Sequence, residues 1–257
     1  MHAIGVMTFN VRQYRGRDGR IDPERILRVI EQGAPDVVAL QDAEAPDGSD
    51  HLSYLENGLK MSVFGRKAGG GNAFLSRFPL RGVGAFSLGG EGICLKADLD
   101  LQGKRIHLFN VRLQPSPLRQ YQQLKSLFGA DLVGNPYLPC PKLILGDFGA
   151  FCPWLWCYPF LAPGRLHRPW GRPTYPAFLP LVSRDRVYHL EDIEITQATV
   201  LWNPLARSAS SHLPLQVTVR IRDSLDYLHA ERIREEMGTA AGCFRKKTAF
   251  RSHEGCG

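Results

Sequence analysis

The chain has 257 residues, of which 44% are hydrophobic and 22% charged, so it can bury a large core like an ordinary soluble globular protein. Its formal net charge is +7 and its pI about 9.2, which favours anionic partners such as phosphate esters, nucleic acid or acidic lipid surfaces. The sequence contains no apolar run of membrane-spanning length, and we expect no signal peptide.

The N-terminal part of the chain predicts a β-α-β unit. Residues 4–9 form an apolar strand, and residues 37–40 form the next one. Between them, Asp22 is a helix cap, Pro23 suits the first helical position, and Glu24 favours the positive end of the helix. Gly33 ends this helix, and a weak helical pattern follows at residues 52–59.

The rest of the chain is richer in strands than in helices. A second helix is predicted from Ser116 and Pro117 to Gly129, and an amphipathic helix over 223–237. The predicted strands are 74–76, a hairpin of 93–101 with 106–113, 143–147, 186–188, 198–201 and 215–221. Because several successive strands pair as hairpins, we predict a two-sheet sandwich with helices on its outer faces.

The cysteines show neither a CxxC pair nor the spacing of a zinc site. They are Cys94, Cys140, Cys152, Cys157, Cys243 and Cys256. A chain of this length needs no disulfide staples, so we interpret them as mostly buried thiols in a reducing compartment. We therefore expect a cytoplasmic protein.

Polar side chains stand where predicted strands end. Asp147 follows Gly146 after a short apolar run, and Asn10, Asp42 and His212 also follow apolar, β-rich surroundings. Polar groups at strand ends indicate a site more than a core. Each has a structural alternative, because Asn10 and Asp42 also suit turns or caps and a single histidine is usually structural.

Seven stretches in chain order resemble the endonuclease/exonuclease/phosphatase superfamily of metal-dependent phosphoesterases. They are Thr8–Val11, Asp18–Asp42, Gly71–Leu80, Phe109–Leu113, Gly146–Ala150, Thr174–Val187 and Ser211–Pro214. The resemblance covers about residues 4–222. It implies an α/β fold, a four-layer α/β sandwich in which two mixed β-sheets pack face to face and are flanked by helices. We expect one such domain over 1–222 and a C-terminal helix with a basic, flexible tail over 223–257.

The resemblance also implies phosphoester hydrolysis with Mg²⁺ or Mn²⁺. Asn10 and Asp42 would be metal-side ligands, with Asn10 also near the substrate. Asp147 would orient the attacking water, and His212 would contact the phosphoryl oxygens. Asp185 would hold the imidazole of His212 in one tautomer, although it could instead pair with a neighbouring arginine on the surface.

Four positions depart from the family pattern. The family's metal-binding Glu is Asp42, its Asn after the catalytic Asp is Gly149, its Asp before the catalytic His is Ser211, and a His is replaced by Arg112. Fewer carboxylates predict weaker metal affinity than in the usual family member. Arg112 could grip a phosphate bidentately and supply part of the missing charge, or it could be a solvated edge residue.

Two functions follow from these residues. The first is hydrolysis of a phosphodiester or phosphomonoester. The second is a catalytically inactive protein that holds a phosphorylated ligand, a partner or a membrane surface in the same cleft. The aromatic segment 151–160 either packs as a long loop or contacts a membrane or partner, and the basic tail is either a solvated end or a contact for anionic lipid or nucleic acid. Nucleic acid is the less favoured ligand, and we expect a monomer.

Overall fold

The computed structural model describes residues 3–66, 70–101, 103–138, 141–149, 172–190 and 193–221. Its strands are β1 (Ala3–Asn10), β2 (Val37–Gln41), β3 (Ser62–Phe64), β4 (Ala73–Ser76), β5 (Leu80–Gly89), β6 (Gly92–Leu101), β7 (Lys104–Arg112), β8 (Lys142–Asp147), β9 (Asp185–Leu190), β10 (Ile193–Val200) and β11 (Leu215–Ile221). Its helices are α1 (Pro23–Gly33), α2 (His51–Leu59), α3 (Pro117–Leu127) and α5 (Pro204–Ala209), with a 3-10 turn η1 (Arg12–Tyr14). Among the helices within these ranges, none is both long and apolar enough to span a membrane. The predicted helix over 223–237, the basic tail and segment 151–160 lie outside the described residues.

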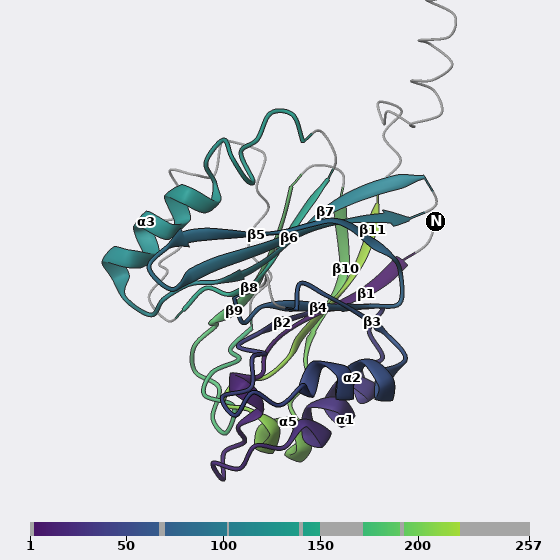
Figure 1. The fold of residues 1–257 in the computed structure, drawn as a ribbon, viewed down its shortest axis with the longest axis vertical. Helices are drawn as coiled ribbons and strands as arrows, with labels where there is room; N and C mark the ends of the chain where they lie inside the picture. The colour runs from purple at the N-terminus through teal and green to yellow at the C-terminus, as the bar shows by residue number, and fades with distance from the viewer. Residues whose placement is uncertain are drawn as a thin grey trace, which may run out of the picture.

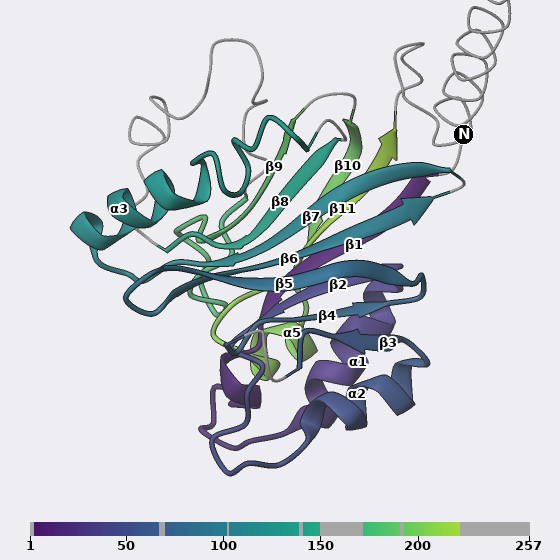
Figure 2. The same cartoon turned by 45° about the horizontal axis from the view of Figure 1, so that its top comes forward.

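Two mixed sheets form the centre of the fold. One has six strands in the order β10-β11-β1-β2-β4-β3, and the other has five in the order β5-β6-β7-β8-β9. Each sheet contains one parallel pair, β1 with β2 and β7 with β8, beside antiparallel neighbours. Figures 1 and 2 show α1, α2 and α5 outside the first sheet and α3 outside the second. This is the α/β sandwich that the sequence predicts.

Three apolar layers hold the sandwich together. Between the sheets, Val6 packs in one cluster with Leu95 and Leu145. Met7, the next residue of β1, belongs instead to the layer under α1 and α2, because successive strand side chains point to opposite faces. A third layer places Leu124 of α3 against the outer face of the second sheet. Burial on both faces explains why these strands read as continuous apolar runs.

The predicted β-α-β unit is confirmed, and its helix begins as expected. The Asp22 carboxylate accepts a hydrogen bond from the backbone N–H of Arg25 at 3.3 Å, which caps α1. The described cysteine, Cys94, is a free, buried thiol. Strands β3 and β5 are not predicted by the sequence analysis. Most of β5 is exposed at a sheet edge and rich in glycine, so it lacks the alternation that predicts a strand.

Buried Asn110 joins the two sheets near one end of the sandwich. Its Nδ2 on β7 donates to the carbonyl oxygens of Leu40 and Ala73, both at 2.9 Å. Its Oδ1 accepts from Gln41 Nε2 at 2.8 Å. Since Leu40 and Gln41 lie on β2 and Ala73 on β4, one amide connects three strands from both sheets. The ends of β1, β2, β7 and β8 meet at this side of the molecule.

Candidate active site

Strand register brings four of the predicted site residues together. In the parallel pairs, Asn10 at the end of β1 stands beside the end of β2, and Arg112 at the end of β7 is paired with Asp147 at the end of β8. Asn10 Nδ2 then donates to Asp42 Oδ2 and to Asp147 Oδ2, each at 3.0 Å. Asn10 therefore connects carboxylates that are carried by different sheets.

Gly146 allows β8 to deliver Asp147 to this site. Its φ is +147°, and a Cβ at this position would overlap the carbonyl oxygen of Val111 on the neighbouring strand. Only glycine permits such a close approach of two backbones. The apolar strand β8 thus ends on the buried carboxylate of Asp147, whose residue is 2% exposed.

Asp147 has a dense set of partners. Arg184 Nη2 lies 2.9 Å from Asp147 Oδ2, and the backbone N–H of Gly149 donates to Oδ1 at 2.8 Å. Burial is the largest influence on this carboxyl group and raises its pKa, with the Asp185 charge acting in the same direction. His212 and Arg184 oppose the shift without cancelling it. A carboxylate with a raised pKa is a better proton acceptor.

His212 is held by Asp185 and faces Asp147. Its Nδ1 donates to Asp185 Oδ2 at 2.9 Å, and its Nε2 lies 3.8 Å from Asp147 Oδ2. Burial alone would lower the pKa of His212, but the charges of Asp185 and Asp147 and the Asp185 hydrogen bond outweigh it and raise the pKa. The imidazolium form is therefore favoured, which suits a proton donor.

The segment before β9 supports this acid–base group. The Tyr175 ring lies 5.0 Å from the His212 ring, and the guanidinium carbon of Arg184 lies 4.7 Å from the centre of the same tyrosine ring. Thr174 Oγ1 accepts the backbone N–H of Asp185 at 3.2 Å. These contacts fix the positions of the imidazole, the guanidinium and the Asp185 backbone together.

A cleft of about 390 Å³ opens beside Asp147, and we call it the arginine cleft. It is lined by Arg12, Gln13, Asp42, Glu91, Arg112, Leu113, Gln114, Pro115, Asp147 and Arg184. The Arg112 guanidinium forms an ion pair with the Asp42 carboxylate. Each of six residues contacts the next, and we call this series the contact chain: Arg112, Asp42, Asn10, Asp147, His212 and Asp185. The structure thus brings all six predicted site residues together.

Two cationic residues of the cleft were not predicted as site residues. Arg184 is one of the arginines that neighbour Asp185 in the sequence, but in the structure it pairs with Asp147. Arg12 lines the cleft from η1, directly after the strand end at Asn10. The signal for Arg12 was its place two residues after a predicted site residue. Arg184 becomes visible only when β8 and β9 are paired in register.

The substituted positions Gly149 and Ser211 also have clear surroundings. Gly149 has a φ of +71°, and a Cβ there would overlap the side-chain amide of Gln120. The carbonyl of Ser211 accepts the backbone N–H of Ala177 at 2.8 Å, so this turn is fixed by its backbone. Residue 149 therefore favours glycine through its positive φ and the nearby end of the Gln120 side chain, whereas the hydrogen bond of residue 211 does not depend on its side chain.

Residues 7–213 match the Endonuclease/Exonuclease/phosphatase family. The chain belongs to this family. The match spans most of the described fold and includes every residue of the contact chain from Asn10 to His212. The sequence has no match among curated proteins.

Solved structures of the family share the fold. An endonuclease/exonuclease/phosphatase from Beutenbergia cavernae is 20% identical with a TM-score of 0.70, covering 86% of this chain and 72% of that one. A family protein from Bacteroides thetaiotaomicron is 15% identical with a TM-score of 0.70, covering 89% and 98%. D. rerio TDP2, solved with a single-strand DNA product, is 14% identical with a TM-score of 0.68, covering 86% and 100%.

Members of the family typically use a divalent metal, but the predicted ligand pair, Asn10 and Asp42, suits one poorly here. Asn10 Oδ1 accepts the backbone N–H of Arg12 at 2.9 Å, which directs the Nδ2 donor toward both carboxylates. The Asp42 carboxylate already has the positive charge of Arg112 beside it. A donor amide and one compensated carboxylate offer a hard cation little.

The described residues also contain a second arrangement with metal-ligand spacing. Asp147, Asp185 and His212 place ligand atoms within 4.8 Å of one another, and all three are buried. The ligand atoms already have partners, since Arg184 binds Asp147 and His212 Nδ1 donates to Asp185. A cation at this position would have to compete with the ion pair of Arg184.

Proposed function

We propose that the protein hydrolyses a phosphate ester, either a diester or a monoester, in the arginine cleft. The observation that carries this proposal is the buried His212, with Nδ1 bound to Asp185 and Nε2 facing Asp147. Two titratable groups with opposite roles, a carboxylate that accepts a proton and an imidazolium that donates one, stand side by side.

In the proposed reaction, water attacks phosphorus and the bond from phosphorus to the leaving oxygen breaks. Asp147 orients the water and takes its proton, while His212 contacts the phosphoryl group and protonates the leaving oxygen. Arg112 and Arg184 bind the phosphoryl oxygens and stabilise the charge of the transition state. Asp185 keeps the imidazole in one tautomer.

The same proposal includes weak binding of Mg²⁺ or Mn²⁺. Arg112 and Arg184 each contact a carboxylate that would otherwise attract a metal cation. Their guanidinium groups therefore supply positive charge at the cleft in place of the metal. Hydrolysis should therefore depend less on divalent metal than is usual for the family. No step of the proposed reaction requires the ion.

Hydrolysis of an aryl phosphodiester tests the proposal, in Mn²⁺ and in chelator. The matched variants are Asp147→Asn and His212→Ala, which should each lower kcat by about a hundredfold or more because general acid–base groups contribute at least that much. Short oligonucleotides belong among the substrates tested, since the TDP2 structure holds a single-strand DNA product. Equal, near-zero rates in wild type and both variants would exclude hydrolysis.

A second candidate function is binding without catalysis. It is favoured by the engagement of both Asp147 oxygens: Oδ1 by Gly149 and Arg184, and Oδ2 by Asn10 and Arg184. An inactive cleft would still hold a phosphorylated ligand through its arginines. Saturable binding of a phosphate ester, together with absent turnover, would support this function over hydrolysis.

A further inference from the structure

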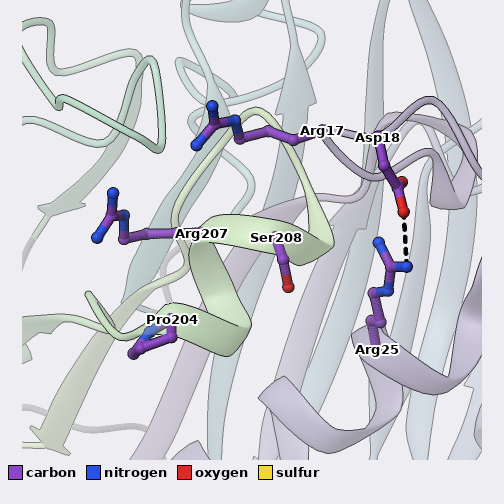
Figure 3. Close-up of a pocket in the computed structure, with 6 residues that line it drawn as sticks. All are labelled: Arg17, Asp18, Arg25, Pro204, Arg207 and Ser208. Atoms are coloured by element: carbon purple, nitrogen blue, oxygen red, sulfur yellow. Dashed lines mark hydrogen bonds and ion pairs between the residues drawn. The ribbon is translucent and has the colours of Figure 1, made fainter.

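A second cavity, of about 660 Å³, lies outside the arginine cleft. It is formed by the loop after η1, the start of α1 and the short helix α5, and we call it the α5 cavity. Its lining residues are Arg17, Asp18, Arg25, Pro204, Arg207 and Ser208 (Figure 3). None of them belongs to the contact chain of the proposed active site.

The carboxylate that lines the α5 cavity, Asp18, is already paired with an arginine of the cavity wall. Asp18 Oδ2 lies 2.8 Å from Arg25 Nη2, and Arg25 Nε lies 2.9 Å from Asp22 Oδ2. The hydrogen bond from Arg25 is the largest cause that lowers the pKa of Asp18 to about 2. Arg25 thus serves two carboxylates, and Asp18 remains ionised and paired at neutral pH.

The other two arginines of the cavity have no carboxylate partner within the described ranges. The Nε–H of Arg207 is buried and has no hydrogen-bond acceptor among the described residues. Arg17 contacts the ring of Phe178, with its guanidinium carbon 5.1 Å from the ring centre. Figure 3 shows both arginines extending to the same side of α5, away from the Asp18–Arg25 pair.

The cavity wall is built by close packing. The backbone N–H of Arg17 donates to the carbonyl of Ser208 at 3.2 Å. A Cβ on the preceding Gly16 would lie 2.7 Å from the same carbonyl oxygen and 2.6 Å from Arg25 Nη1. The loop can approach α5 this closely only with glycine at this position. The two arginines are consequently presented by a fixed backbone.

We propose that Arg17 and Arg207 form a second anion site, which binds a phosphate group other than the one in the arginine cleft. The unpaired, buried Nε–H of Arg207 and the guanidinium of Arg17, which has no carboxylate partner within the described ranges, supply charge-assisted donors, and a phosphate has the oxygens to accept them. The site is assigned from these contacts alone and does not depend on hydrolysis at Asp147.

The position of this site indicates the kind of ligand it takes. Arg12 in the arginine cleft and Arg17 are five residues apart in the chain, so their Cα atoms are at most about 18 Å apart. Tyr175 under Arg184 and Phe178 under Arg17 belong to one segment, and Phe178 is 48% exposed. This inference rests on the proposed function, which binds one phosphate in the arginine cleft: the ligand has a second phosphate for the α5 cavity and an intervening part that contacts Phe178.

Arginine side-chain NMR tests the site directly. Inorganic phosphate is titrated into the full chain, and the Nε–H signals of Arg17 and Arg207 are assigned with Arg17→Lys and Arg207→Lys. Both signals should shift along a saturable curve, in wild type and equally in Arg112→Gln, whose arginine cleft is impaired. Arg28, which pairs with Glu24 on α1, is the internal control. Shifts that do not saturate, or that match those of Arg28, would overturn the proposal.

Affinity for ligands with two phosphates tests the inferred ligand class. The probes are a sugar bisphosphate and a 5′-phosphorylated oligothymidylate, measured with wild type, Arg17→Gln/Arg207→Gln and the control Arg28→Gln. The double variant should bind the favoured probe about tenfold more weakly, as for a lost charge-assisted hydrogen bond, while Arg28→Gln binds as wild type. The probe that loses affinity identifies the source as a small molecule or a nucleic acid strand. Unchanged affinity for both probes would exclude a second phosphate in the α5 cavity.

Discussion

Arg184 binds both carboxylate oxygens of Asp147, with Nη2 2.9 Å from Oδ2 and Nε 3.3 Å from Oδ1. The pair is well shielded, since the side chains are 16% and 2% exposed. Removing one member of such a pair leaves the other charge buried without compensation. Arg184 is therefore one of the two charges, with His212, that oppose the rise in the pKa of Asp147 caused by burial.

Replacing Arg184 with Gln should raise the pKa of Asp147 further above its ordinary value. Arg184 is one of the charges that oppose the upward shift caused by burial. NMR of the Asp147 side-chain carboxyl carbon as a function of pH measures this pKa, with Arg28→Gln as the control. A pKa of Asp147 that stays unchanged in Arg184→Gln would contradict the role of the ion pair.

Asp185→Asn should lower the pKa of His212. In wild type this pKa is raised above about 6.5, so His212 stabilises the fold at low pH and this contribution is lost as the pH rises through its folded-state pKa. Without the Asp185 charge, burial should dominate and disfavour the imidazolium. Proton NMR of the imidazole measures the pKa of His212. Urea unfolding at a series of pH values from below about 6.5 upward measures the change in stability.

The matched control is Asp98→Asn, because Asp98 Oδ1 lies 2.7 Å from His107 Nδ1 in a second histidine–carboxylate pair. This variant should leave the titration of His212 unchanged. A His212 pKa that falls equally in both variants would point to a general loss of structure and not to the Asp185 contact.

Metal affinity should be low in wild type and should rise when family residues are restored. The triple variant Asp42→Glu, Arg112→His and Ser211→Asp adds a carboxylate and removes the competing guanidinium, so calorimetry should show at least about tenfold tighter Mn²⁺ binding. Gly149 stays unchanged, because its φ of +71° strains most side chains and the Gln120 amide would have to move. Wild-type binding as tight as that of the triple variant would refute the predicted weakness.

Asn110→Ala should destabilise the fold by about 3 kcal/mol, because it leaves the buried carbonyls of Leu40 and Ala73 and the Gln41 amide without this partner. Urea unfolding gives the free-energy change. The control is Asn135→Ala, which removes one acceptor for the backbone N–H of Tyr137 in a surface turn and should cost about 0.5 kcal/mol. Similar costs for the two variants would show that Asn110 adds little to sheet-to-sheet cohesion.

The sequence was sufficient to place the predicted residues in one site because their positions are fixed by strand ends. Asn10 and Asp147 are far apart in the chain, yet each ends a buried strand. The motifs that contain the predicted residues also follow one another in the order seen in a single family. The α/β sandwich followed from the same strands. For His212 and Asp185, the sequence predicts a position in the site and an acid–base chemistry. Their roles in a reaction stay predictions.

The remaining features depend on contacts that no local pattern encodes. Arg184 is adjacent to Asp185 in sequence, which suggests a neighbouring ion pair, but the pairing of β8 with β9 sets it against Asp147 instead. The α5 cavity is assembled from Arg17 and Arg207, which are brought together by the close approach at Gly16. Strand β5 was missed because an exposed, glycine-containing edge carries no burial signal.

The ion pair of Arg112 with Asp42 also matters before any ligand arrives. Because the guanidinium of Arg112 is already the counter-ion of Asp42, this carboxylate needs no cation from the surrounding solution to balance its charge. A phosphate that enters the arginine cleft, as proposed, would share or displace this internal partner. Its binding would thus exchange one ion pair for another, and the affinity would vary with the salt concentration around the protein.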